Sequence, residues 1–333
     1  MDIGSDPDDT CVAVMVLRDL ARFRPALLLT NDETEAAGRA RFLARLVALA
    51  AADVPVAAGL PSRRRRRDCI VEEAGLCPAT AHFEADGVAA LIRVLEAHPS
   101  ITYFGLGALT NLDAALAARP DLAPRVRLLQ MGPALFGAYP REQPQYNARL
   151  DPGAFSRALG RVPAPTLVFS HSTWGRYGEG SRQRLGIYPD DPLAGALREE
   201  SPLAALFVQH LEAWKQSGKP CSIMHDPLTV LSASTPDLVD LAEVELVIGD
   251  DGWAGLSALA HEGLRALSPA RTGVIADCLV APHRLIQGRT IAARMSLGID
   301  DEAVRSSIVE ALLGRGAEAV AAAWGELNRA RGE

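Results

Sequence analysis

The sequence has few of the features that mark membrane, secreted or nucleic-acid-binding proteins. No apolar run in its 333 residues approaches the length that spans a bilayer, although 48% of the residues are hydrophobic. No secretory signal precedes the first acidic residues, so we expect a cytoplasmic protein that does not bind membranes. The net charge of −7 disfavours general affinity for nucleic acid.

Cysteine and histidine are scarce and scattered. The five cysteines are odd in number and lack the paired spacing of metal ligands, which indicates free thiols in a reducing compartment. Because no histidine or cysteine cluster accompanies the acidic residues, a zinc site is disfavoured. Five isolated histidines are interpreted as surface or satisfied core residues: His82, His98, His210, His261 and His283.

Short β-prone runs alternate with helical stretches, which predicts an α/β protein with an open, mostly parallel twisted sheet and helices on both faces. Helical periodicity extends over 40–51, over 86–98 and over 301–332, where Gly314 and Gly316 predict a break into two helices. No linker or internal repeat divides the chain, so a single domain is predicted over residues 1–333. The predicted strands are 25–30, 54–59, 101–107, 126–132 and 165–170.

Four aspartates stand within the first nine residues: Asp2, Asp6, Asp8 and Asp9. Such a cluster repels itself, and it is tolerable mainly where a hard cation or several positive donors lie among the oxygens. A helix cap would explain one or two of them, since the sequence from Thr10 onward has helical character. Four aspartates instead indicate a metal or sugar-hydroxyl site, although their spacing does not fit an EF-hand loop.

A second polar segment, CSIMHDPLTVL, places His225 beside Asp226, with Pro227 as the expected first residue of a helix. Two further segments carry polar residues after candidate strands: GLGALTNLDAAL contains Thr110, and QPQYNARLDPGAF contains Asn147. Ligands of open α/β sheets bind beyond the carboxyl ends of the strands, so these segments are expected to converge on one crevice.

These four segments together resemble the nucleoside hydrolase family, which consists of calcium-dependent N-ribohydrolases acting on inosine, uridine and related ribosides. The family's opening motif is a strand followed by DTDxGxDD. The sequence DIGSDPDD is similar to it, with Asp2, Gly4, Asp8 and Asp9 in matching places and two residues inserted between them. HDPL matches without a gap, and LTNL matches the family's GPLTNLA with Ala108 in place of proline. The resemblance covers most of the chain.

The resemblance implies a site for Ca²⁺ and for a small-molecule nucleoside or riboside. Asp2 would be the catalytic base for the attacking water, and His225 would lie near the departing base as a candidate acid. This suits a reaction that builds an oxocarbenium-like sugar and needs negative charge, a positioned water and a better leaving group. The implied metal ligands are Asp2, Asp9, Asp226 and the main-chain carbonyl of Thr110, with Asp6 as an alternative for Asp2. The implied substrate contacts are Asp8, or Asp6 in its place, Asn31, Gln145, Asn147 and His171. A homodimer or homotetramer is also implied.

The sequence departs from the family pattern in three places. The strand expected before Asp2 is not in the sequence, and Gln145 stands where the family has a glutamate. The family's glycine-rich loop with a histidine has no clear match near 63–87, where the arginines Arg63 to Arg67 are predicted to form a solvated loop on the ligand side. We therefore expect ribose chemistry to be kept and base recognition to be rebuilt, with Trp174 and Tyr177 as candidates for stacking on the base.

Three hypotheses follow. The first is a calcium-dependent hydrolase of the N-glycosidic bond with an unusual aglycone. The second is a family member that binds a ribosylated ligand but turns it over poorly, because of the missing strand and Gln145. The third is a metal-binding structural subunit whose partner supplies the strand. Release of free ribose, with and without a chelator, separates the first hypothesis from the other two.

Overall fold

The structure is a computed structural model that describes residues 1–61, 69–137, 142–174, 185–268, 271, 275, 279, 286–314 and 316–330. The predicted arginine loop and Tyr177 lie outside these residues, as does the side chain of Trp174.

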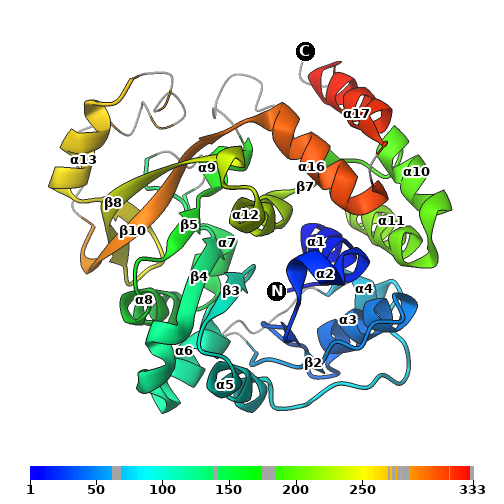
Figure 1. Ribbon diagram of the computed structural model, residues 1–333, viewed down its shortest axis with the longest axis horizontal. Helices are drawn as coiled ribbons and strands as arrows, with labels where there is room; N and C mark the ends of the chain where they lie inside the picture. Colours follow the sequence, from blue (N-terminus) through cyan, green and yellow to red (C-terminus); the bar gives the residue numbers. More distant parts are fainter. Residues whose placement is uncertain are drawn as a thin grey trace.

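A six-stranded sheet forms one side of the described molecule, with the strand order β3-β4-β5-β10-β8-β9 (Figure 1). Its first three strands, β3 (Ile101–Gly105), β4 (Val126–Met131) and β5 (Thr166–Val168), are mutually parallel, as predicted. β10 (Gly288–Ile299) continues parallel to β5. β8 (Val239–Gly249) and β9 (Ala254–Leu256) then add antiparallel pairings.

Two shorter strand pairs lie apart from this sheet. β1 (Leu28–Leu29) pairs in parallel with β2 (Val56–Ala57), and both lie inside strands predicted from the sequence. β6 (Gly186–Ile187) pairs antiparallel with β7 (Ser222–Ile223). The predicted α/β class is confirmed. The strands β8, β9 and β10 were not predicted, and their antiparallel pairings make the main sheet a mixed sheet.

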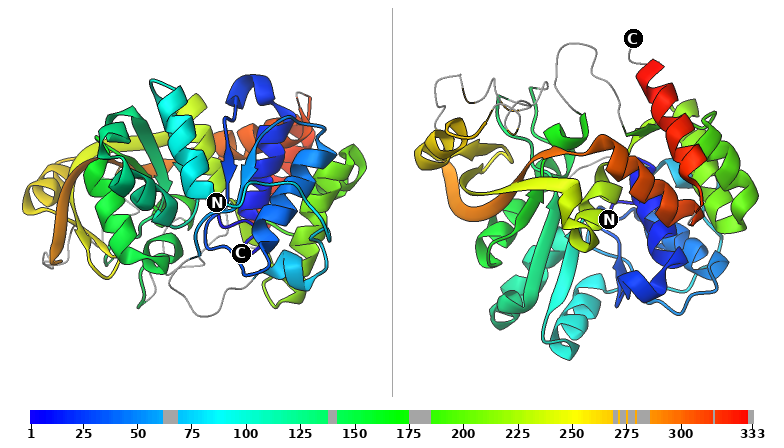
Figure 2. Two further views of the ribbon diagram at one scale, coloured as in Figure 1. Left: turned by 90° about the horizontal axis from the view of Figure 1, so that it is seen from below. Right: turned by 45° about the horizontal axis from the view of Figure 1, so that its top comes forward.

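Helices cover the sheet and build the other side of the molecule, which Figure 2 shows from two further directions. The predicted break at the C-terminal glycines is confirmed, since one helix ends at Leu313 and the next begins at Glu318. The α-helices are α1 (Asp8–Arg18), α2 (Leu20–Phe23), α3 (Gly38–Leu49), α4 (Ile70–Glu73), α5 (Gly87–Ala97), α6 (Thr110–Ala118), α7 (Tyr146–Leu150), α8 (Pro152–Arg161), α9 (Ser170–Trp174), α10 (Pro192–Glu200), α11 (Pro202–Gln216), α12 (His225–Ser234), α13 (Ala258–Arg265), α16 (Asp301–Leu313) and α17 (Glu318–Ala330). Two 3₁₀ helices, η1 (Pro120–Arg125) and η2 (Pro236–Leu238), precede β4 and β8.

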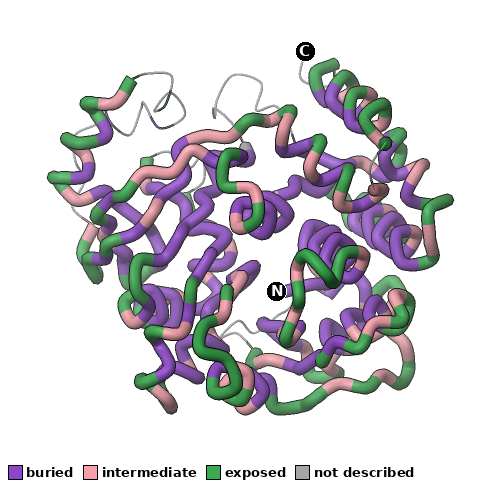
Figure 3. Tube along the Cα trace, in the orientation of Figure 1, coloured by how far each residue is buried: buried purple, intermediate pink, exposed green. Residues whose placement is uncertain are grey.

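The buried side chains fall into two large clusters. Figure 3 shows where the buried residues lie along the chain. One gathers helices α1, α3, α10, α11, α12, α16 and α17, and the other joins the six-stranded sheet to α5, α6, α8 and α13. Helix α1 is buried on all sides from Asp8 to Leu17, which is the pattern of a helix surrounded by other elements. That residues 1–333 form a single domain stays a prediction.

Helix α12 begins at His225, two residues before the predicted start at Pro227. Proline is tolerated there because the first N–H groups of a helix have no intrahelical acceptor. The earlier start places Asp226 within the first helical turn.

Candidate active site

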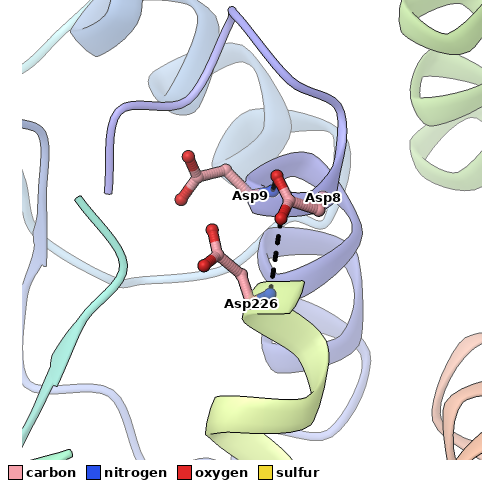
Figure 4. Close-up of side chains that lie close together, drawn as sticks. All are labelled: Asp8, Asp9 and Asp226. Atoms are coloured by element: carbon pink, nitrogen blue, oxygen red, sulfur yellow. Dashed lines mark hydrogen bonds between the residues drawn. The ribbon is translucent and has the colours of Figure 1, made fainter. Parts of the chain in front are cut away.

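Three carboxylates meet where two helices begin. Asp8 and Asp9 open α1, and Asp226 lies in the first turn of α12. One oxygen from each of the three lies within 4.8 Å of the other two, and all three residues are buried. Figure 4 shows the carboxylates of Asp9 and Asp226 pointing to the same side, with Asp8 next to them. We refer to Asp8, Asp9 and Asp226 as the aspartate triad.

Main-chain hydrogen bonds hold Asp8 in place but leave part of the triad without donors. The amide of Asp9 donates to Asp8 Oδ1 at 3.0 Å, and the amide of Asp226 donates to Asp8 Oδ2 at 3.4 Å (Figure 4). Asp9 Oδ1 is buried and has no hydrogen-bond partner in the described part of the chain. A buried carboxylate oxygen without a donor is costly, so the arrangement favours a positive ligand.

Burial raises the pKa of each triad carboxyl well above its ordinary value, and neighbouring carboxylates raise it further. Asp6 and Asp9 act on Asp8, Asp2 acts on Asp9, and Asp8 acts on Asp226. A cation among these oxygens would offset both the burial and the repulsion. A donor set made of carboxylate oxygens fits a hard divalent cation such as Ca²⁺.

Asp2 lies beside the triad but outside the group of three. A Cβ built on Gly107 would come within 2.5 Å of both Asp2 Oδ1 and Asn31 Oδ1, so these two side chains approach the same glycine. Asn31 Oδ1 is buried and lacks a hydrogen-bond partner among the described residues. Burial raises the pKa of Asp2, although the guanidinium of Arg39 and the amino group of Met1 act in the opposite direction. Gly107 thus makes room for two predicted site residues.

The fully buried Arg39, at the start of α3, holds the acidic loop in place. Its guanidinium donates to the carbonyls of Asp2 and Ile3, the latter at 2.8 Å, and to Ser5 Oγ at 3.1 Å. It also reaches Asp32 through the carbonyl oxygen at 2.8 Å and the carboxylate at 3.4 Å. The planar fork of arginine suits such multiple contacts. Sequence reasoning missed this residue, because nothing in a helical stretch marks one arginine as buried.

Asp6 forms a hydrogen bond with β7. Its Oδ1 accepts a short hydrogen bond from Ser222 Oγ, and burial raises the pKa of its carboxyl to about 6 despite that bond. The same loop is fixed by His210, which donates from Nε2 to the carbonyl of Ser5 at 3.2 Å and accepts from Thr10 Oγ1 at Nδ1. Burial lowers the pKa of His210 to about 3, so this histidine is a neutral core residue, in line with its interpretation from the sequence.

His225 is oriented by a hydroxyl that the sequence did not indicate. Thr173 Oγ1 donates to the carbonyl of Ser170 at 3.0 Å and makes a short hydrogen bond with His225 Nδ1. Since the hydroxyl proton is used on Ser170, Nδ1 of His225 is the donor to Thr173. The neutral ring therefore carries its proton on Nδ1 and its lone pair on Nε2.

A family model tests the resemblance found in the sequence. The model of the inosine-uridine preferring nucleoside hydrolases matches residues 1–306. The chain belongs to the nucleoside hydrolase family. The predicted resemblance and the predicted enzyme class, an N-glycosyl hydrolase, are thereby confirmed.

Solved structures of nucleoside hydrolases share the fold of this family member. A plant nucleoside hydrolase is 17% identical with a TM-score of 0.68, covering 94% of this chain and 97% of the other. The purine-preferring ribonucleoside hydrolase from Gardnerella vaginalis is 14% identical with a TM-score of 0.65, covering 96% and 98%. The inosine-uridine preferring enzyme from Bacillus anthracis is 16% identical with a TM-score of 0.62, covering 93% and 97%. A search of curated proteins finds no match.

Two of the predicted substrate contacts, Gln145 and Asn147, make hydrogen bonds within the protein. Gln145 caps α7, where its Oε1 accepts from the amides of Asn147 at 2.8 Å and Ala148 at 3.3 Å. Asn147 Nδ2 donates to the carbonyl of Met131 at 3.3 Å. Thr110 Oγ1, at the start of α6, donates to Asp151 Oδ2 at 3.3 Å. The substrate and metal roles of these residues stay predictions.

His171 lies at the start of α9, beside β10. Its Nε2 donates to the carbonyl of Ser296 at 2.8 Å, and its buried Nδ1 has no hydrogen-bond partner within the described ranges. Burial lowers the pKa of His171 to about 4, so the ring is neutral at physiological pH. Its predicted contact with substrate stays a prediction.

None of the described helices combines the length and hydropathy that crossing a bilayer requires.

Proposed function

We propose that this family member is a calcium-dependent nucleoside hydrolase that cleaves the N-glycosidic bond of a ribonucleoside and releases ribose and a base. The observation that carries the proposal is the buried aspartate triad, with a carboxylate oxygen on Asp9 that no described donor satisfies. Three carboxylates in one buried place repel one another, and a divalent cation among them removes that cost.

The metal would be held by Asp9 and Asp226, with Asp2 and the carbonyl of Thr110 completing the protein ligands. The position of Asp8 in the triad supports a metal role for this residue besides the ribose contact predicted from the sequence. Calcium is favoured because the donors are all oxygens. When bound, the cation would polarise the attacking water and neutralise the carboxylates around it.

The remaining residues supply proton transfer and positioning. Asp2 would take the proton of the attacking water, since its carboxyl lies next to the triad and its raised pKa makes it a better base. Asn31 and Asn147 would hold ribose hydroxyls, and the unsatisfied Oδ1 of Asn31 is free to accept one. The carboxylates surround a sugar that gains positive charge in the transition state and so stabilise it.

His225 would protonate the departing base. Because its neutral ring carries the proton on Nδ1, donation from Nε2 requires the imidazolium form. The predicted homodimer or homotetramer and the cytoplasmic location stay predictions.

Release of free ribose from inosine, uridine, adenosine, guanosine and cytidine tests the proposal. We expect hydrolysis of at least one nucleoside, loss of that activity in a chelator, and recovery on adding calcium. The matched variants are Asp226→Asn, which removes a triad charge, and Asp240→Asn, which removes a carboxylate of an exposed pair with Arg271. Activity that survives complete chelation, or survives Asp226→Asn unchanged, would contradict the metal site.

A further inference from the structure

Helix α9 follows directly after strand β5 and begins with a buried polar sequence. Its first four residues are each at most 4% exposed: Ser170, His171, Ser172 and Thr173. Buried hydroxyl and imidazole groups are unfavourable unless hydrogen bonds replace their lost contact with water. The partners of these groups therefore account for the presence of a polar segment in the interior.

One fully buried residue of β10, Ser296, holds the start of α9. Its hydroxyl accepts from the amide of Phe169 at 2.8 Å and shares a hydrogen bond of 2.6 Å with Ser172 Oγ. Its carbonyl accepts from His171 Nε2 at 2.8 Å. The main-chain pairing of β10 with β5 ends at the residue before Ser296. The Ser296 side chain thus continues the contact between the two segments where the ladder stops.

Strand β10 is irregular at the same place. Ser296 lies opposite Leu241 of β8, whereas Gly298 lies opposite Asp240, so β10 has one extra residue between them. An extra residue of this kind bends its strand, and such bulges are frequent next to active sites. The irregularity therefore lies at the residue that anchors α9.

Helix α9 also contacts α12, and Figure 1 shows the two helices close together. Thr173 Oγ1 donates to the carbonyl of Ser170 at 3.0 Å and accepts a short hydrogen bond from His225 Nδ1. The next residue of α12, Asp226, donates its amide to Asp8 Oδ2 of α1 at 3.4 Å. The start of α12 is therefore bonded to both α9 and α1.

The hydrogen bond to Thr173 fixes two properties of the His225 ring. It sets the direction of the ring, because Nδ1 must point at Thr173 Oγ1. It also selects the tautomer, because the bond made by one ring nitrogen determines which nitrogen carries the proton. Neutral histidine in water favours the opposite tautomer, with the proton on Nε2. Loss of the Thr173 hydroxyl should therefore be visible in the ring itself.

We propose that Thr173 is a positioning residue for His225: from a helix anchored on β10, it fixes the direction and tautomer of the ring, so that Nε2 is the nitrogen that acts on the departing base. This rests on the acid role proposed above for His225. When Nε2 gives its proton to the base, the electron pair of the C–N bond leaves with the base. The ring then returns to the neutral form that is protonated on Nδ1. Thr173 contacts no reacting atom in this role and acts through the ring.

Nitrogen NMR of the chain with isotope-labelled histidine tests the tautomer. The signals of His225 are identified among those of the seven histidines by their loss in His225→Gln. Where the ring is neutral, the parent should show a protonated Nδ1 and an unprotonated Nε2. Thr173→Val should shift the ring toward the form protonated on Nε2. Thr173→Ser keeps the hydroxyl and should retain the tautomer of the parent.

Thr229→Val is the matched control for the loss of a buried hydroxyl. Thr229 is fully buried in α12, and its Oγ1 donates to the main-chain carbonyl of His225 at 3.3 Å. This variant should therefore leave the tautomer unchanged. A parent ring with its proton on Nε2 would overturn the proposal, and so would the same tautomer in the parent and in Thr173→Val. The first of these results needs no variant, so the test holds even where Thr173→Val does not fold.

Steady-state kinetics measure what the tautomer contributes to the reaction. Thr173→Val should lower kcat for a nucleoside by about tenfold or more, with KM little changed, and Thr173→Ser should restore kcat. Hydrolysis of a nitrophenyl riboside should change little, because its leaving group needs no proton. Equal losses on both substrates would overturn the positioning role. A parent that releases no ribose contradicts the proposed hydrolysis itself, whereas the NMR spectra still decide whether Thr173 sets the tautomer.

Discussion

Replacing Asp226 by asparagine should stabilise the metal-free protein at alkaline pH while abolishing its response to calcium. The substitution keeps the shape of the side chain and the main-chain N–H that donates to Asp8 Oδ2. It removes one of three carboxylates whose ligand oxygens lie within 4.8 Å of one another. The change is therefore electrostatic, with little loss of packing.

The magnitude follows from the spacing of the triad. Two unit charges separated by 4.8 Å repel by about 3.5 kcal/mol at an effective dielectric constant of about 20. Asp226 takes part in two of the three pairs, which gives about 7 kcal/mol for a fully ionised triad at this separation. Protons bound by the metal-free site relieve most of this repulsion. We therefore expect that the variant gains only a part of this energy, roughly 2 kcal/mol, in the free energy of unfolding at pH 8.

The pH dependence gives the sign of the effect. Burial and like charges raise the pKa values of Asp8, Asp9 and Asp226 in the folded chain above the ordinary value of 3.8. The folded state then binds more protons than the unfolded state between pH 3.8 and the raised values, so stability falls as pH rises through that window. The Asp226→Asn variant lacks one of these carboxyl groups, so its free energy of unfolding should fall less as pH rises. The two proteins should be equally stable near pH 4, where the triad is protonated.

Urea unfolding in a chelator from pH 4 to pH 8, repeated with calcium, measures both effects. Calcium at about 100 times its Kd should stabilise the parent by about 2.7 kcal/mol and leave the variant unchanged. Asp240→Asn is the control, because its exposed pair with Arg271 contributes about 0–1 kcal/mol at every pH. A variant that is less stable than the parent by the same margin at pH 4 and pH 8 would refute the electrostatic reasoning.

Two further predictions concern the neighbours of the triad. Gly107→Ala places a methyl group 2.5 Å from Asp2 Oδ1 and Asn31 Oδ1, so it should weaken calcium binding at least tenfold in calorimetry. Gly195→Ala is the control, because its methyl group meets open space in α10 and should leave calcium affinity unchanged. Equal calcium affinities of the two variants would contradict the role of Gly107. His225→Gln should slow hydrolysis of nucleosides with poor leaving groups by roughly 10²-fold while barely affecting a nitrophenyl riboside. Equal losses on the two substrates in steady-state kinetics would assign His225 to binding.

The parts of the fold that were predictable are those with a single, strong local signal. β4 and β5 are buried apolar runs, and α3 and α5 have clear helical periodicity. β8 and β10 were missed because charged residues such as Glu245 interrupt their apolar pattern, a consequence of lying in the antiparallel half of the sheet. The sequence signals of β1 and β2 predicted strands of six residues, whereas the structure pairs two residues in each.

The candidate site was predictable where chemistry is concentrated in one segment. The sequence indicated Asp8, Asp9 and Asp226, because charged residues next to apolar segments are unfavourable unless a ligand or a hydrogen-bond donor compensates them. Arg39, Gly107 and Thr173 did not, because each acts through a contact with a residue distant in sequence: Arg39 with Asp2, Gly107 with Asn31, and Thr173 with His225. Such contacts depend on how helices and strands are assembled, and single residue types carry no local signal for them.

The competing explanation of the N-terminal aspartates as helix caps can be weighed against the contacts they make. A capping aspartate would precede the helix and accept from an amide two or three residues on. The N-cap residue is Pro7 in α1 and Met224 in α12, and neither of these side chains caps its helix. Asp8, Asp9 and Asp226 lie within the first turns, where the helix dipoles stabilise negative charge by about 0.3–1 kcal/mol each. That is smaller than the repulsion of about 3.5 kcal/mol per pair, so the helices alone do not account for three carboxylates in one place, whereas a divalent cation does.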